Sequence, residues 1–307
     1  MKKIFNLIVS FVLLAGFSAC NKDGSDKPGL PPAPVPTVNY KGLTFISSGN
    51  STVCLAKVGA PDEITLEYST DESQWNPYTI GEKISLADGT FLLFRAGEQK
   101  NLTFSKGSDS YYHFEISGPV TAQGNIMSLL DRDFSTPLST NAFFALFEGC
   151  KSLLSAPELP ATTMAQGCYF RMFAECTGLK SAPELPAEAL AYNCYGRMFK
   201  GCSALTYVPD LPATKMEAYC YNSMFANCTS LIFAPELPAK RLESNCYQHM
   251  FEGCTSLTSA PELPATELVS NCYEFMYKDC RNLRYVIGLF TTEPSEKTTK
   301  DWLSGVA

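Results

Sequence analysis

The sequence predicts a multidomain protein in which a small all-β, sandwich-like domain precedes an α/β solenoid of 26-residue repeats. Two columns of cysteine recur every 26 residues between Cys150 and Cys280. Within each unit, apolar residues are spaced by four, as on one face of a helix. Residues 39–122 instead contain short β-branched and aromatic runs separated by turn formers. A fixed period of this size indicates units that stack, because one unit cannot bury its apolar face alone.

Composition excludes several functions. The chain of 307 residues is 45% hydrophobic, which argues against wholesale disorder. A net charge of -7 and a pI near 5.0 argue against a nucleic-acid partner. The 13 cysteines and 2 histidines form no CxxC or HxxxH pair, and GxSxG, HExxH, GxGxxG and P-loop patterns are absent. We therefore expect no metal, no cofactor, no catalytic residue and a monomeric, non-enzymatic protein.

The first residues have the plan of a secretion signal. Lys2 and Lys3 precede an apolar run over residues 4–17 that is too short to span a bilayer comfortably. Cys20 follows small residues directly after the run, as in bacterial lipoprotein signals. We predict a signal peptide over residues 1–19 and lipidation of Cys20; an ordinary signal peptide with an incidental Cys20 is the alternative.

A proline-rich tether follows over residues 20–38. Proline-rich segments behave as semi-rigid spacers of about 3.1 Å per residue. This segment is predicted to hold the folded part away from the lipid surface. Asp23 and Asp26 resemble the acidic surface-export signals of Bacteroidetes lipoproteins, although a plain solvated linker explains them equally.

Residues 39–122 are predicted to form an antiparallel sandwich or barrel, because their strand-like runs recur every eight to twelve residues or so. Four aromatic residues in this region are candidates for a sugar-stacking platform: Trp75, Tyr78, Tyr111 and Tyr112. Packing in the core is the alternative for aromatics at alternating strand positions.

The repeats are predicted over residues 147–290, with an entry cap over 123–146 and a C-terminal cap or tail over 291–307. Met164, Cys168, Met172 and Cys176 are spaced by four, which predicts a helix over residues 161–174. A short parallel strand is expected over residues 180–182, before a proline segment. Eight helical residues span about 12 Å, whereas a disulfide needs Cα atoms within about 7 Å. We therefore expect the repeat cysteines to be reduced core residues.

An acidic residue recurs inside each Pro-(Glu/Asp)-Leu-Pro string and is the candidate binding column. Stacked like charges repel, so solvent, salt, Ca²⁺ or a basic partner should offset the column. An exposed position tolerated by solvation is the preferred interpretation, and an acidic stripe for a cationic ligand is the alternative. Two further columns vary between repeats and are candidates for specificity, although the periodicity leaves open which of them face outward. The acidic column is Glu158, Glu184, Asp210, Glu236 and Glu262. The variable columns are Phe170, Gly196, Asn222, Gln248 and Glu274, and Arg171, Arg197, Ser223, His249 and Phe275.

The recurring MFxxCxxLxxAPELPA and CYxxMF strings resemble the BspA-type leucine-rich repeat proteins of Bacteroidetes. Residues 250–265 carry one such string, and residues 302–307 are similar to the family's C-terminal cap. The resemblance implies a leucine-rich-repeat fold, an outer-membrane lipoprotein exposed on the cell surface, and adhesion or recognition of host or microbial ligands. It carries no catalytic residues.

Three functions remain open. The first is a surface lipoprotein whose solenoid binds a protein partner. The second is a glycan-binding module that uses the N-terminal β domain, and the third is an architectural spacer.

Overall fold

The computed structural model describes residues 41–99 and 102–306, all of which belong to one compact unit, Thr37–Ala307. The predicted signal peptide, Cys20 and the whole proline-rich tether over residues 20–38 lie outside the described residues. Within the described part, no helix has the length and apolar character needed to cross a bilayer.

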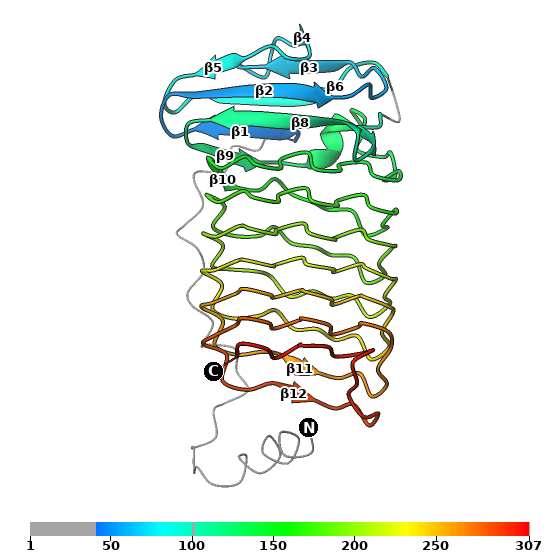
Figure 1. Cartoon of the computed structure of the whole chain (residues 1–307). Coiled ribbons are helices and arrows are strands. Elements are labelled where there is room, and N and C mark those ends of the chain that lie inside the picture. The colour runs from blue at the N-terminus through cyan, green and yellow to red at the C-terminus, as the bar shows by residue number, and fades with distance from the viewer. Residues whose placement is uncertain (1–40, 100–101, 307) are drawn as a thin grey trace. The chain divides into compact units, whose positions relative to one another are not determined.

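The N-terminal part consists of two sheets (Figure 1). One sheet has the strand order β10-β9-β1-β6-β3-β4, and the other has the order β5-β2-β8-β7. All pairs are antiparallel except β10 with β9. The strands are β1 (Leu43–Ser47), β2 (Ser51–Val58), β3 (Leu66–Ser69), β4 (Asn76–Tyr78), β5 (Ile84–Leu86), β6 (Phe91–Ala96), β7 (Ser105–Gly107), β8 (Ser110–Ser117), β9 (Val120–Gln123) and β10 (Leu153–Ser155).

Aromatic residues from both sheets form the core between them. Phe45 on β1 contacts Phe94 on β6 and Phe114 on β8, with ring centroids 6.0 and 5.0 Å apart and edge-to-face geometry. Such pairs add about 0.5–1.5 kcal/mol beyond the area they bury. The antiparallel β structure expected for this region from its strand-length runs is therefore present, although the fold class predicted for the whole chain is not.

The α/β leucine-rich-repeat solenoid predicted for residues 147–290 is wrong. The described part of the chain contains no α-helix, and its one helical element is the 3-10 helix η2 (Ile126–Leu129). The 26-residue units are instead flattened coils, one below another, from green to red in Figure 1. We call them coils, and together they form the repeat stack.

One side of each coil is a run of consecutive turns, which we call a turn segment. In the segment 167–175, Tyr169 N donates to Cys194 O of the next coil at 3.0 Å. Phe170 N donates within its own coil, to Gly167 O at 3.0 Å. N–H groups thus bond alternately to the next coil and to the residue three positions back. The turn segments are 141–149, 167–175, 193–201, 219–227, 245–253 and 271–279.

This backbone produces the spacing of four without a helix. Every fourth residue has a left-handed backbone, as at Arg171 (φ 58°) and Glu175 (φ 61°). Two consecutive side chains face inward and the next two face outward, so Cys168 and Tyr169 are buried whereas Phe170 is partly exposed. A helix turns once in 3.6 residues and places adjacent residues about 100° apart, so it cannot bury adjacent pairs at a strict period of four.

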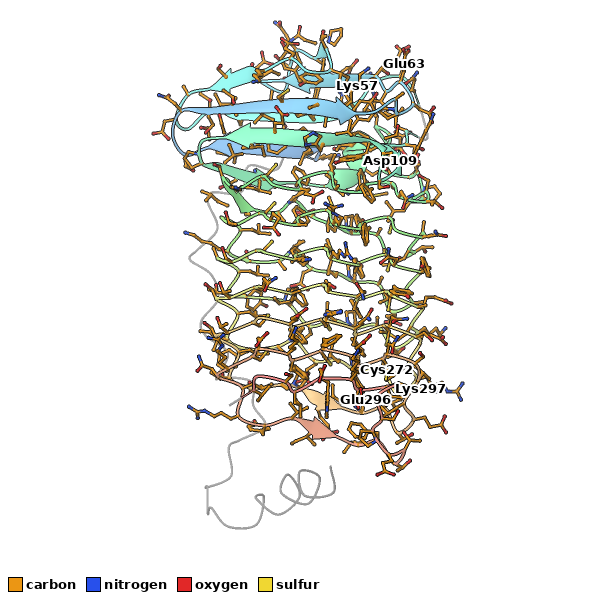
Figure 2. The ribbon with its side chains drawn as sticks, in the orientation of Figure 1. Lys57, Glu63, Asp109, Cys272, Glu296 and Lys297 are labelled. Carbon is orange, nitrogen blue, oxygen red and sulfur yellow. The ribbon has the colours of Figure 1, made fainter. Side chains whose placement is uncertain are left out.

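Inward side chains stack on their equivalents in neighbouring coils. Tyr169 and Tyr195 have parallel rings with centroids 5.9 Å apart, and Phe173 and Phe199 have centroids 5.5 Å apart. All twelve cysteines in the described part of the chain are buried and unpaired, as expected. Figure 2 marks Cys272 among the coils, and its Sγ lies 3.7 Å from Thr298 O of the following coil.

The other side of each coil has an extended backbone, which forms few β-bridges with the neighbouring coils. Ser181 forms an isolated parallel bridge with Tyr207, and Phe233 forms one with Ser259. Longer pairing occurs at β10 and between β11 (Glu262–Leu263) and β12 (Ile287–Gly288), which are parallel. The prolines of each unit limit the ladder because they have no N–H to donate. The expected parallel strand over residues 180–182 is reduced to these bridges.

Both ends of the repeat stack contact other segments. At the first coil, Phe114 of β8 stacks on Phe147 with ring centroids 5.1 Å apart, and Phe147 stacks in turn on Phe173. This contact places Phe147 in the same column as Phe173, which lies one unit later in the sequence. At the last coil, Tyr277 N donates to Trp302 O at 2.9 Å, so residues 297–304 form a further turn segment.

Candidate functional site

The outward pairs of the turn segments carry a groove of about 470 Å³. It crosses four consecutive coils, and all of its lining residues occupy outward positions. Side chains at these positions are not needed to fill the core, so they are free to differ from coil to coil. The lining residues are Phe170, Tyr192, Asn193, Arg197, Lys200, Tyr219, Asn222, Ser223, Ala226, Asn227, Gln248, His249 and Glu252.

Aromatic residues line one part of the groove. Tyr192 and Tyr219 contact edge to face with centroids 5.7 Å apart, and Tyr192 is 45% exposed. Gly196 lies in the column between Phe170 and Asn222. A Cβ on Gly196 would lie 2.9 Å from the Phe170 ring and 2.1 Å from Asn193 Oδ1. No side chain fits at this position unless Phe170 and Asn193, which both line the groove, move away.

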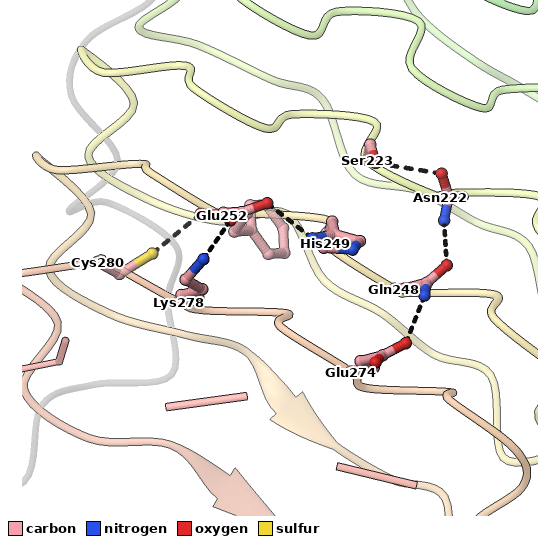
Figure 3. A network of polar contacts seen from close by, with 9 residues as sticks. Asn222, Ser223, Gln248, His249, Glu252, Glu274, Lys278 and Cys280 are labelled. Atoms are coloured by element: carbon pink, nitrogen blue, oxygen red, sulfur yellow. Dashed lines mark hydrogen bonds and ion pairs between the residues drawn. The ribbon is translucent and has the colours of Figure 1, made fainter. Parts of the chain in front are cut away.

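Amide side chains form a ladder across three coils (Figure 3). Asn222 Nδ2 donates to Gln248 Oε1 at 2.7 Å, and Gln248 Nε2 donates to Glu274 Oε2. Ser223 Oγ donates to Asn222 Oδ1 at 3.1 Å. The ladder fixes the orientation of these amides, because each bond occupies one donor and one acceptor.

A second polar cluster surrounds Glu252. His249 Nδ1 lies 2.7 Å from Glu252 Oε2, and Lys278 Nζ lies 3.1 Å from Glu252 Oε1. Burial opposes ionisation of Glu252, but the hydrogen bonds from Lys278 and His249 prevail and hold the pKa of this carboxyl below its usual range. The His249 ring stacks on Phe275 with centroids 4.8 Å apart. Glu252 is thus already paired with the Lys278 ammonium and the His249 ring.

Arg197 and Lys200 supply positive charge to the groove. Arg197 is exposed, and its guanidinium lies 5.9 Å from the centre of the Phe170 ring. Among the described residues that line the groove, Glu252 is the single acidic one. The aromatic part of the groove is therefore locally cationic, on a chain whose net charge is -7.

The predicted acidic column lies elsewhere. All five carboxylate residues, Glu158, Glu184, Asp210, Glu236 and Glu262, are exposed, and none of them lines the groove. Glu262 belongs to β11, on the extended side of its coil. In the described part of the chain, no group of three or more potential ligands is placed to hold a metal ion.

The four aromatics of the N-terminal region do not form one exposed platform. Tyr78 and Tyr112 are core residues, at 7% and 3% exposure. Tyr78 Oη donates to Glu82 O at 2.6 Å, and Tyr112 Oη donates to Asp62 O at 2.9 Å. Trp75 is covered by the Arg95 guanidinium, 3.7 Å from its ring centre. Tyr111 instead packs against Phe144 of the first turn segment, with centroids 5.3 Å apart.

Sequence reasoning singled out the two variable columns but not Tyr192 and Tyr219. The structure brings these tyrosines beside the variable columns on the outward side of the turn segments. Each tyrosine differs in type from the residues at the equivalent position of the other repeats. The equivalents of Tyr219 are Asn141, Gly167, Asn193, Asn245 and Asn271, and those of Tyr192 are Thr140, Gln166, Ala218, Ser244 and Ser270. Both tyrosines can be found from the sequence by comparing the repeats position by position.

Comparison with known proteins yields no relative: the chain matches no family model, no curated protein and no solved structure.

Proposed function

We propose that this protein is a non-enzymatic recognition protein, attached to the outer membrane by lipid at Cys20 and exposed on the cell surface. In this proposal the outward side of the turn segments binds an extracellular partner, and the proline-rich segment holds that side away from the lipid. The secretion-signal pattern before Cys20 and the string resemblance to BspA-type surface proteins support the location.

The groove of about 470 Å³ is the observation that carries the binding role. Its volume falls in the range of about 300–1,000 Å³ that is usual for ligand sites. Neighbouring coils repeat their inward residues faithfully, yet they differ at the outward positions that line the groove. A spacer needs only the repeated inward residues and has no use for aromatic and cationic side chains gathered in a hollow.

Glycan binding by the N-terminal β region has less support. Tyr78 and Tyr112 are buried and hydrogen-bonded, and Trp75 is covered by Arg95. Recognition is therefore assigned to the repeat stack.

The binding role is tested by probing arrays of extracellular proteins and glycans with the detergent-solubilised full chain. The groove variant is Gly196→Phe, whose side chain must displace Asn193 and Phe170 of the groove lining. The matched control is Glu184→Gln on the acidic column. We expect ligands of the parent chain to be retained by the control and lost by the groove variant, with both variants giving a cooperative thermal unfolding transition. Equal binding by the parent chain and the groove variant would contradict the proposal.

The anchor is tested separately by metabolic labelling with an alkyne fatty acid. The parent chain is expected to incorporate the label and to be cleaved by protease added to intact cells. Cys20→Ser is expected to incorporate none. Incorporation by the serine variant, or protection of the parent chain from the protease, would contradict the predicted anchor or its exposure.

A further inference from the structure

We propose that the groove takes an acidic saccharide, a sugar ring that carries a carboxylate. In this arrangement the ring packs against Tyr192 and Tyr219, and the carboxylate lies at Arg197 and Lys200. This inference rests on the proposed function and names the class of ligand for the same groove.

The tyrosine pair provides the surface for the ring. Tyr192 is 45% exposed and is supported from the side by Tyr219. Aromatic side chains combine a large apolar area with a fixed geometry, and the C–H face of a pyranose ring is apolar in the same way. Phe170 lines the same hollow across Gly196.

The backbone at Tyr219 is unfavourable for a tyrosine. Its φ is 60°, in the left-handed region, which costs an ordinary L-residue about 1–2 kcal/mol. Asparagine or glycine, which tolerate this region, occupy the same position in the other five turn segments. Left-handed residues recur throughout the turn segments, so the unusual feature of Tyr219 is a bulky ring in a column of asparagine and glycine, and this ring lines the groove. That combination supports a role in binding.

The charges favour an anion. Arg197 and Lys200 line the groove, and no ion pair joins either of them to a described carboxylate. Glu252 is already paired with His249 and Lys278, so its charge does not neutralise Arg197 and Lys200. A guanidinium matches the geometry of a carboxylate with two parallel hydrogen bonds, and such charge-assisted bonds are stronger than neutral ones.

The amides fit hydroxyl groups. Asn193, Asn227 and Gln248 line the groove and offer both donors and acceptors, as a hydroxyl does. The backbone offers little to a peptide, because N–H and C=O groups of the turn segments are already bonded within and between coils. A peptide added as an extra strand needs a free edge, so a saccharide fits this site better than an acidic peptide.

The experiment uses the detergent-solubilised full chain and three immobilised probes: polygalacturonate, hyaluronan and polysialic acid. Each is paired with its carboxyl-reduced form, in which the carboxylate is replaced by an alcohol, and poly-glutamate is the peptide competitor. We expect at least one acidic polysaccharide to bind about tenfold or more tightly than its reduced form. Poly-glutamate should not displace it.

Four variants locate the binding. Arg197→Ser places the residue of the next coil at this position and is expected to weaken binding of the acidic probe by about tenfold, while leaving the reduced probe unchanged. Tyr192→Ser should weaken both probes. Tyr219→Asn should weaken both probes while raising or maintaining the melting temperature, since it restores the column residue. Glu184→Gln is the control and should bind as the parent chain does.

Three results would overturn the proposal: no acidic probe binds, the reduced and acidic forms bind equally, or the groove variants bind as well as the parent chain. Displacement by poly-glutamate would assign the groove to an acidic peptide instead. If the arrays identify a protein ligand that the Gly196→Phe variant loses, and no acidic polysaccharide binds, recognition by the groove stands and the saccharide assignment fails.

Discussion

Each cysteine of the column from Cys150 to Cys280 makes the same local contact. The Cys202 thiol donates to Phe173 O at 3.1 Å, and the Cys228 thiol donates to Phe199 O at 3.1 Å, each on the preceding coil. The carbonyl also accepts a backbone bond within its own coil, from Cys176 N in the case of Phe173. The small, weakly polar thiol therefore satisfies a lone pair in a space where larger side chains do not fit.

Burial makes the repeat thiols unreactive. Burial raises the pKa of Cys150 to about 12, and the pKa of Cys228 is also raised, chiefly by burial. At pH 8 these groups are therefore protonated, and the protonated thiol is a poor nucleophile. In the full chain carrying Cys20→Ser, we expect Ellman's reagent to label none of the twelve remaining cysteines (13 minus Cys20) until urea unfolds the protein. Rapid labelling of any repeat cysteine in the folded protein would show that its thiol is accessible to the reagent and would contradict the assigned burial.

The turn segment is the element that distinguishes this fold from a helical repeat. Asn193, Asn245 and Asn271 hold left-handed positions with φ between 52° and 59°. Asparagine tolerates this region better than most residues do. Asparagine recurs in this column at positions 141, 193, 245 and 271, a sequence signal that favours left-handed backbone over a helix.

Replacement of Asn245 tests the turn segment directly. Asn245 is 7% exposed, has φ 59° and does not line the groove. We expect Asn245→Ala to lower the free energy of unfolding by about 1 kcal/mol or more, because alanine resists the left-handed region. Asn245→Gly should cost less, since glycine enters this region freely. Urea denaturation of both variants checks the order, and a more stable alanine variant would contradict the assigned backbone.

At the scale of the whole repeat stack, each coil is bonded to its neighbours by the same pattern. Tyr221 N donates to Cys246 O and Tyr247 N donates to Cys272 O, both at 3.1 Å. Stability in such an array is approximately the sum of coil terms and nearest-neighbour terms. A whole coil is therefore removable, whereas a partial one is not.

Deletion of residues 255–280 removes 26 residues and joins Cys254 to Arg281, so every column stays aligned. We expect this variant to unfold cooperatively with a lower melting temperature. Deletion of residues 255–278 removes 24 residues and shifts the last segment by two positions, which turns its inward pairs outward. That control should fail to give a cooperative transition in thermal unfolding followed by circular dichroism. Equal behaviour of the two deletions would contradict the coil register.

The sequence by itself determined the 26-residue period, the inward columns, the β character of the first region and the free state of the repeat cysteines. These follow from the chain alone because burial selects residue types at fixed intervals, whatever backbone connects them. The backbone of the repeat was mispredicted as helical, since a spacing of four fits both a helix stripe and alternating inward and outward pairs. Left-handed residues such as Arg171 and Glu175 decide between the two.

Only the tertiary structure located the groove. It separated the acidic column from the groove, placed Tyr78 and Tyr112 in the core, and brought Tyr192 and Tyr219 from adjacent coils into contact. These relations depend on how one coil lies against the next. Residues 27 positions apart, such as Tyr192 and Tyr219, become neighbours only when hydrogen bonds between coils set their register.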